Sequence, residues 1–86
     1  MSEYAVVVAR SARKELEALD EKTLNKIFPK IEGLSFDPRP VGCRKLAGNK
    51  NLWRLRVGEY RVVYAVDDNM RLVDIIAVRD RKDAYR

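Results

Sequence analysis

The chain of 86 residues contains no histidine and only one cysteine, and these absences narrow its possible chemistry. Structural and catalytic zinc sites rely on histidine nitrogen and cysteine sulfur, so a zinc centre of that kind is close to excluded. A Ser-His-Asp or Cys-His nucleophile is excluded outright, because both need an imidazole. Cys43 has no second cysteine in the chain, which excludes an internal disulfide and suits a reducing cytoplasm. We expect neither a metal nor a cofactor.

Long hydrophobic runs are missing as well. The longest apolar stretches fall far short of the ~20 residues that span a bilayer, so we expect no membrane partner. The first ten residues, MSEYAVVVAR, lack a basic leading region and carry Glu3, which is typical of a first strand and not of a signal peptide. Repeats, low-complexity tracts and linkers are also absent. Residues 1–86 are therefore predicted to form a single domain with a modest core.

The first half of the chain predicts one strand and two helices. The valine-rich run YAVVVA at 4–9 has the length and composition of a strand. Ser11 is expected to cap a short first helix and Asp20 to cap a second one. Pro29 should kink or interrupt the second helix, and the sequence DPRP at 37–40 should stop it. The second helix has one apolar stripe, made of Leu24, Ile27, Phe28, Ile31 and Leu34.

The second half changes from a helical period to the alternation of strands. Trp53, Leu55 and Val57 alternate with Arg54 and Arg56, and two further apolar runs follow at 60–66 and 72–78. This pattern predicts an antiparallel three-strand meander. The predicted fold class is α+β, with an N-terminal strand, two helices and the meander, and with the helices on one face of a four-stranded sheet.

The dipeptide Gly58-Glu59 sets a register for the first hairpin. Glycine at the first of two loop positions fits a type II′ turn, which would place Val57 opposite Tyr60 and Arg56 opposite Arg61. Side chains alternate between the faces of a strand, so the arginines at 54, 56 and 61 should share one face. The opposite face, toward the helices, would then hold Trp53, Leu55, Val57, Tyr60, Val62 and Tyr64.

The positive charge is concentrated in the same region. Residues 39–61 carry seven basic residues and one acidic residue, a net charge of +6, whereas residues 10–38 sum to zero. Like charges facing each other across strands are destabilising, and converging forked guanidinium groups suit a phosphate. A nucleic acid is thus the first partner to consider. The alternative is a solvated sheet face on which arginines pair with a carboxylate such as Asp74.

The run KLAGNKNLWRLRVGEYRVVYAVDDN, preceded by DPRP and followed by IIAVRDRKDAYR, resembles the RelE/ParE toxin superfamily. The similarity is greatest to the RelE-type members of bacterial toxin–antitoxin modules, and it covers nearly the whole chain. It implies a microbial-RNase-like fold and the toxin component of a type II module. It also implies a cytoplasmic, ribosome-dependent endoribonuclease that cuts mRNA in the ribosomal A site and inhibits translation. A cognate antitoxin, acidic and partly helical, would wrap around such a toxin.

The resemblance also implies site residues. The catalytic positions of the family match Arg54, Arg56, Arg61, Arg81 and Tyr85, with the match in the tail weaker than that in the hairpin. Basic residues around this strip are expected to contact RNA or the ribosome: Arg39, Arg44, Lys45, Lys50 and Arg79. Tyr85 would stack on a base or take part in proton transfer, or else anchor the tail to the sheet.

Two departures from the family bear on mechanism. Arg54 and Arg56 stand where well-known members have lysines, and Asp80 stands where many relatives have a histidine. Arginine is too basic to accept a proton, so the arginines are expected to bind the scissile phosphate and stabilise its developing charge. The general base is left open among Asp80, Glu59, the substrate's own geometry and a ribosomal group.

Two other functions remain open from the sequence. A ParE-like toxin would share this fold but act on DNA gyrase, and a non-catalytic nucleic-acid-binding module or inactivated toxin would keep the basic face without cleavage. The apolar stripe on the helices is expected to be mostly core. Any exposed part of it would offer an antitoxin groove, and the basic face would attract an acidic antitoxin segment.

Overall fold

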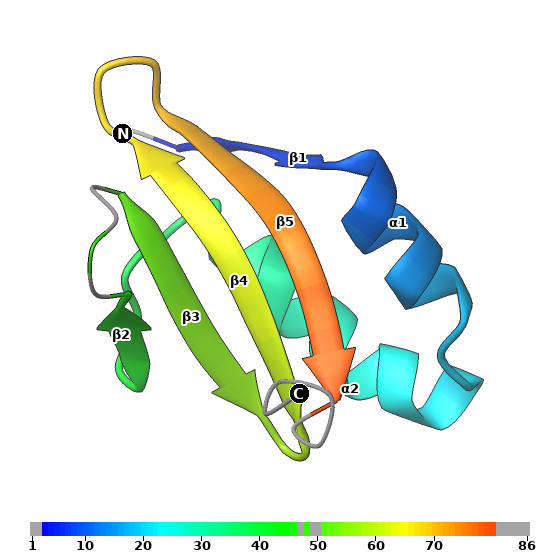
Figure 1. Cartoon of the computed structure of the whole chain (residues 1–86). Helices are drawn as coiled ribbons and strands as arrows, with labels where there is room; N and C mark the ends of the chain where they lie inside the picture. The colour runs from blue at the N-terminus through cyan, green and yellow to red at the C-terminus, as the bar shows by residue number, and fades with distance from the viewer. Residues whose placement is uncertain (1–2, 47, 49–50, 81–86) are drawn as a thin grey trace.

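The computed structural model describes residues 3–46, 48 and 51–80 of the chain. Within these residues the elements are β1 (Ala5–Val8), α1 (Arg10–Glu17), α2 (Glu21–Gly33), β2 (Cys43–Lys45), β3 (Leu52–Val57), β4 (Tyr60–Asp67) and β5 (Leu72–Asp80). The strands form one sheet in the order β1-β5-β4-β3-β2 (Figure 1). β1 runs parallel to β5, and all other neighbours are antiparallel.

The architecture confirms the predicted α+β class and the antiparallel meander of β3, β4 and β5. The sheet differs from the expected one by one strand, because Cys43–Lys45 pairs with β3 and adds a fifth. A strand of three residues is too short to show a period of two in the sequence. None of the helices in the described residues is long and apolar enough to cross a membrane.

The predicted N-terminal cap is confirmed for α2 and not for α1. Asp20 precedes α2 and its side chain accepts a hydrogen bond from the backbone N–H of Thr23 at 2.9 Å, as predicted. The predicted cap at Ser11 is wrong, because α1 already begins at Arg10. Ser11 instead donates its hydroxyl to the backbone oxygen of Ile76 at 3.0 Å and ties α1 to β5.

Pro29 does not interrupt α2, which continues through it to Gly33. A proline removes the hydrogen bond to the carbonyl four residues earlier, here that of Asn25. Both residues are exposed, so water can hydrogen-bond to the carbonyl that the proline leaves unpaired. The helix ends four residues before Asp37, so the DPRP sequence is not what stops it.

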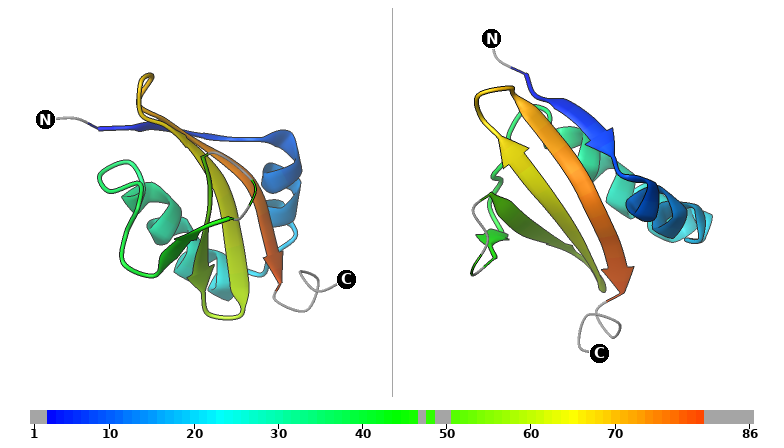
Figure 2. Two further views of the ribbon diagram at one scale, coloured as in Figure 1. Left: turned by 60° about the vertical axis from the view of Figure 1, so that its left-hand side comes forward. Right: turned by 45° about the horizontal axis from the view of Figure 1, so that its top comes forward.

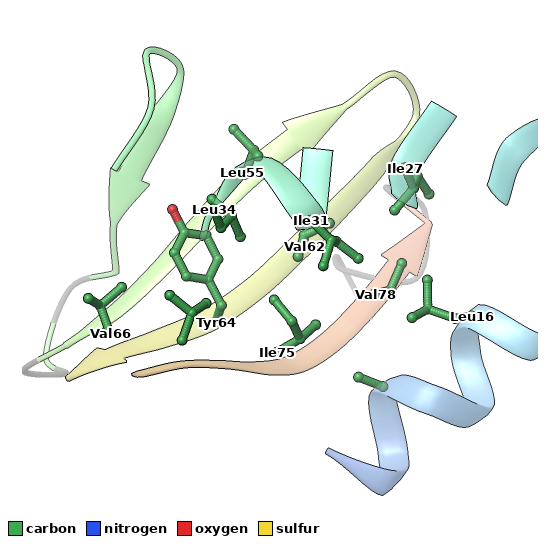
Figure 3. Close-up of a cluster of buried hydrophobic side chains, with 12 residues drawn as sticks. Leu16, Ile27, Ile31, Leu34, Leu55, Val62, Tyr64, Val66, Ile75 and Val78 are labelled. Atoms are coloured by element: carbon green, nitrogen blue, oxygen red, sulfur yellow. The ribbon is translucent and has the colours of Figure 1, made fainter. Parts of the chain in front are cut away.

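The core lies between the sheet and the helices, which cover one face of it (Figures 1 and 2). Leu55, Val62 and Tyr64 point from the sheet into this core, and Trp53, Val57 and Tyr60 pack against it while partly exposed. The predicted apolar face of the hairpin is therefore confirmed. The remaining buried residues of the core include Ala12, Leu16, Ile27, Ile31, Leu34, Val66, Val73, Ile75 and Val78 (Figure 3).

Tyr64 connects this core to the loop before β2. Its ring is fully buried, and its hydroxyl donates a hydrogen bond of 2.8 Å to the backbone oxygen of Pro38. Burial raises the pKa of the Tyr64 phenol, because the phenolate would lose its hydration. Tyr64 therefore stays neutral and holds the loop against the sheet.

A polar cluster joins three distant segments at the far end of β4. The Asp68 carboxylate accepts hydrogen bonds from the Tyr4 hydroxyl at 2.7 Å and from the Arg39 guanidinium at 2.6 Å. The hydrogen bond from Arg39, followed by that from Tyr4, lowers the pKa of Asp68. Arg39 also lies over the Trp53 ring, 5.3 Å from its centroid. This cluster holds the N-terminal segment, the loop after α2 and the β4–β5 turn together.

Replacing Tyr64 with phenylalanine should lower the free energy of unfolding by about 1–2 kcal/mol, because the Pro38 carbonyl loses its buried partner. Urea denaturation measures this change. Tyr60→Phe is the matched control, since Tyr60 lies on the same strand but is only partly buried. Equal stability of the two variants would show that the buried hydrogen bond contributes nothing.

Asp68→Asn should reduce the loss of stability in acid. A folded-state pKa below the unfolded one stabilises the protein above pH ~4, and this contribution disappears as the pH falls through the lowered value. Melting temperatures of wild type and variant should therefore converge between about pH 5 and pH 2. Arg39→Gln removes the main cause of the lowered pKa of Asp68. In this variant too, the melting temperature should fall less between about pH 5 and pH 2 than in wild type. A constant difference across this pH range would contradict the assignment.

Candidate nucleic-acid interface

The β3–β4 hairpin has the turn and the register that the sequence predicts. Gly58 has a φ of +59°, and Glu59 is not among the non-glycine residues of positive φ in the described chain, which is the pattern of a type II′ turn. Val57 pairs with Tyr60 and Arg56 with Arg61. A side chain at Gly58 would meet this backbone angle with strain, so glycine is required here.

Three arginines stand side by side across three neighbouring strands. Arg61 of β4 pairs with Arg56 of β3 on one side and with Arg79 of β5 on the other. Directly opposed residues in antiparallel strands project from the same face, with their Cβ atoms about 5 Å apart. The row Arg56–Arg61–Arg79 thus places three permanent positive charges in one line perpendicular to the strands.

A second cross-strand pair widens the patch. Arg44 of β2 pairs with Arg54 of β3, and Arg54 lies two residues before Arg56 on the same face. We call these five residues the arginine face: Arg44, Arg54, Arg56, Arg61 and Arg79. None of the helices in the described chain covers it, because α1 and α2 lie on the core side of the sheet (Figures 1 and 2).

Arg79 is held in place by a carboxylate from α1. β1 ends at Val8, so among the described residues no strand pairs with the edge of β5 beyond it. Glu15 fills this position: it accepts a hydrogen bond of 2.8 Å from the backbone N–H of Val78 and one of 3.2 Å from Nε of Arg79. One carboxylate therefore closes the sheet edge and offsets part of the repulsion within the arginine row.

The strand register pairs neither Asp80 nor Asp74 with a residue of the arginine row. Asp80 pairs with Tyr60 and so belongs to the face opposite to that of Arg79. Asp74 pairs with Ala65, toward the other end of the sheet, and not with an arginine. Glu59 is exposed in the turn, beyond the Val57–Tyr60 pair. Of the two carboxylates considered as a general base, Asp80 is the one that the register places on the face opposite the row.

The structure does not bring all predicted contact residues together. Arg39 is occupied by Asp68 and Trp53 on the core side, and Lys45 pairs in register with Trp53, so both lie off the arginine face. Arg44 and Arg79 lie on it. Lys50, Arg81 and Tyr85 fall outside the described residues, and their predicted roles remain predictions.

Two features of the site were not predicted from the sequence: the pairing of Arg44 with Arg54 and the contact of Glu15 with Arg79. The pairing of Arg44 with Arg54 depends on β2, which is too short to be predicted. Glu15 was read only as part of a helix with balanced charge, and its link to Arg79 joins residues 64 positions apart. Glu15 is half-buried and lies next to Leu16 on α1, and no local pattern in the sequence shows that its carboxylate reaches β5.

The arginine face is built to bind anions. Guanidinium groups are donors without acceptor capacity, and each can bond two phosphate oxygens at once. In the part of the chain that the structure describes, no group of three histidine, cysteine or carboxylate side chains is placed to hold a metal ion. The chemistry that these residues support is the binding of phosphate and the stabilisation of negative charge.

Comparison with known proteins agrees with the fold. Residues 6–85 match the family described as the ParE toxin of the type II toxin–antitoxin system parDE. The chain is 33% identical to toxin RelE of Mycobacterium tuberculosis over 96% of its own length and 87% of the relative's. It is 36% identical to toxin RelG of that organism over 96% and 97%.

The fold is also similar to that of the RelE–RelB complex from Pyrococcus horikoshii OT3. That comparison has a TM-score of 0.82 at 26% identity, and it covers 92% of this chain and 96% of the other. The family model spans nearly the whole chain, and the curated relatives are matched over most of their length. The chain therefore belongs to the RelE/ParE superfamily of type II toxin–antitoxin toxins.

Proposed function

We propose that this toxin is a ribosome-dependent endoribonuclease that cleaves mRNA in the A site and so inhibits translation. The observation that carries the proposal is the row Arg56–Arg61–Arg79 on a sheet face that the described helices leave uncovered. Three forked guanidinium groups in one line offer several donors to a single phosphate. The similarity to RelE toxins supports mRNA as the source of that phosphate.

The reaction is a displacement at phosphorus. The ribose 2′-oxygen attacks the scissile phosphate, a new P–O2′ bond forms, and the bond from phosphorus to the 5′-oxygen breaks. A proton leaves the 2′-hydroxyl, and another reaches the departing 5′-oxygen. Negative charge grows on the non-bridging oxygens during the attack, and pre-positioned donors there stabilise the transition state. Arg56 and Arg61 take this role in our proposal, with Arg54, Arg81 and Tyr85 as further catalytic residues.

The arginines leave the proton acceptor to another group. Arginine keeps its proton at any physiological pH, whereas the lysines of well-known relatives can be tuned by like-charged neighbours. Asp80 belongs to the opposite face of the sheet, so it does not fit this role from its position in β5. The acceptor is then Glu59 at the turn, the geometry of the substrate itself or a group of the ribosome.

A cognate antitoxin is the second partner in this proposal. Solved relatives include RelE–RelB complexes from Pyrococcus horikoshii OT3 and Mycobacterium tuberculosis. The net charge of +5 and the arginine face favour an acidic antitoxin segment, which would compete with RNA for the same donors. The exposed Phe28 on α2 is the member of the predicted apolar stripe that stays available for a helical partner.

One observation favours a second candidate, the inhibition of DNA gyrase. The matching family model is described by the ParE toxin of parDE and not by a nuclease. A gyrase inhibitor needs no phosphate site, and the arginine row would then have no catalytic purpose. Cell-free translation separates the two: discrete cuts in ribosome-bound mRNA support our proposal, and gyrase-dependent DNA breaks with intact mRNA would replace it.

Arg61→Ala should lower the rate of mRNA cleavage on ribosomes by about 10²–10³-fold, because it removes the central donor of the row. The rate is read from primer extension on ribosome-bound message, and growth after induction should recover in parallel. The melting temperature should stay close to that of wild type, since Arg61 lies outside the core.

Arg13→Ala is the matched control for that variant. It removes the same charge from an exposed position on α1, away from the arginine face, and should leave the cleavage rate unchanged. If Arg61→Ala cleaves as fast as Arg13→Ala, the row is not the catalytic site.

Arg56→Gln should weaken the binding of short single-stranded RNA at low salt. Each phosphate contact to single-stranded RNA contributes about 0.7 to the slope of log K against log salt, because counterions are released. The slope should become shallower by about that amount in Arg56→Gln and stay at the wild-type value in Arg13→Ala. A fluorescence anisotropy titration at several salt concentrations measures it. An unchanged slope in Arg56→Gln would exclude Arg56 from phosphate binding.

A further inference from the structure

A hollow of about 290 Å³ lies on the arginine face between Arg61 and Arg79. The two arginines form its walls, and the remaining lining is apolar: Val63, Ile76 and Ala77. This apolar floor lies directly beside the arginine row.

The floor owes its shape to a β-bulge. Val63 pairs with Ala77, but the next residue of β4, Tyr64, pairs with Ile75, so Ile76 is an extra residue without a partner on β4. A bulge re-aims side chains and is frequent beside functional sites. The backbone oxygen of Ile76 accepts the Ser11 hydroxyl bond at 3.0 Å, which anchors the bulge to α1.

The wall formed by Arg79 is also positioned. Glu15 bonds its Nε and the backbone N–H of Val78, so one edge of the guanidinium is engaged while the Arg79 side chain remains 58% exposed. Guanidinium N–H groups are hydrogen-bond donors, and the edge of a nucleobase carries acceptors for them, while its ring face can lie on apolar side chains. The hollow therefore has an apolar floor and a guanidinium group on each side. Both guanidinium groups also belong to the arginine row that we propose to bind phosphate.

We infer that this hollow is a subsite for one nucleobase of single-stranded RNA, adjacent to the phosphate that the arginine row binds. The base lies on Val63, Ile76 and Ala77 with its edge between the two guanidinium groups. This subsite rests on the proposed function for the identity of its RNA. It does not depend on whether cleavage takes place.

The experiment uses the full chain and short 2′-O-methyl RNAs, which bind but cannot be cut, in which one nucleotide at a time is abasic. At one position the loss of the base should weaken binding to wild type by about tenfold. In Ala77→Leu, whose larger side chain fills the hollow, that position should become insensitive to the base. Ala65→Leu, the same change elsewhere on this face, should keep the wild-type sensitivity.

Two further variants make the outcome decisive. Arg56→Gln should weaken all RNAs alike and keep the tenfold base effect, because it changes the phosphate row and not the hollow. Ala77→Val fills the hollow only in part, so the loss of the base should weaken its RNA binding by less than about tenfold but still measurably. This variant replaces Ala77→Leu if Ala77→Leu does not melt cooperatively.

Equal affinities for every abasic RNA overturn the inference, and so does a base effect that persists in the filled variants. A base effect in a protein that leaves ribosome-bound mRNA intact would keep the subsite and reject the proposed function.

Discussion

The register of the β3–β4 hairpin is the constraint on which the rest of the site depends. Gly58 allows a two-residue turn with a positive φ, and that turn pairs Arg56 with Arg61. A slip by one residue would send every side chain of β3 to the opposite face. Leu55 would then leave the core and the arginines would enter it. The burial of Leu55, Val62 and Tyr64 therefore fixes the position of the arginines as firmly as the turn does.

The arginine row places like charges opposite one another on neighbouring strands, which is locally destabilising. Three opposed positive charges repel one another, and the core behind them supplies the stability to hold them there. Glu15 relieves one end of the row, at Arg79, while it closes the open edge of β5. In our proposal, an RNA phosphate or a carboxylate of an antitoxin binds to several guanidinium groups of this row at once.

Much of the fold and of the site was predictable from local patterns. The alternation around Trp53 and Leu55 predicted the strand, Gly58-Glu59 predicted the turn, and together they predicted the pairing of Arg56 with Arg61. Asp20 was recognised as a helix cap because its hydrogen bond spans three residues. Ser11 was misread since its partner, Ile76, lies 65 residues away. Local rules cannot show which of two hydrogen-bonding partners a side chain prefers when one of them is remote.

The sequence by itself determined the α+β class, the hairpin register and the two faces of β3 and β4, because periodicity and turn chemistry act over a few residues. Tertiary structure decided the rest. It placed Arg79 beside Arg61 through a bulge at Ile76, paired Arg44 with Arg54 through a strand of three residues, and moved Asp80 to the face opposite the row. These placements depend on how separate segments dock against a common core, and that packing joins residues that no local pattern connects.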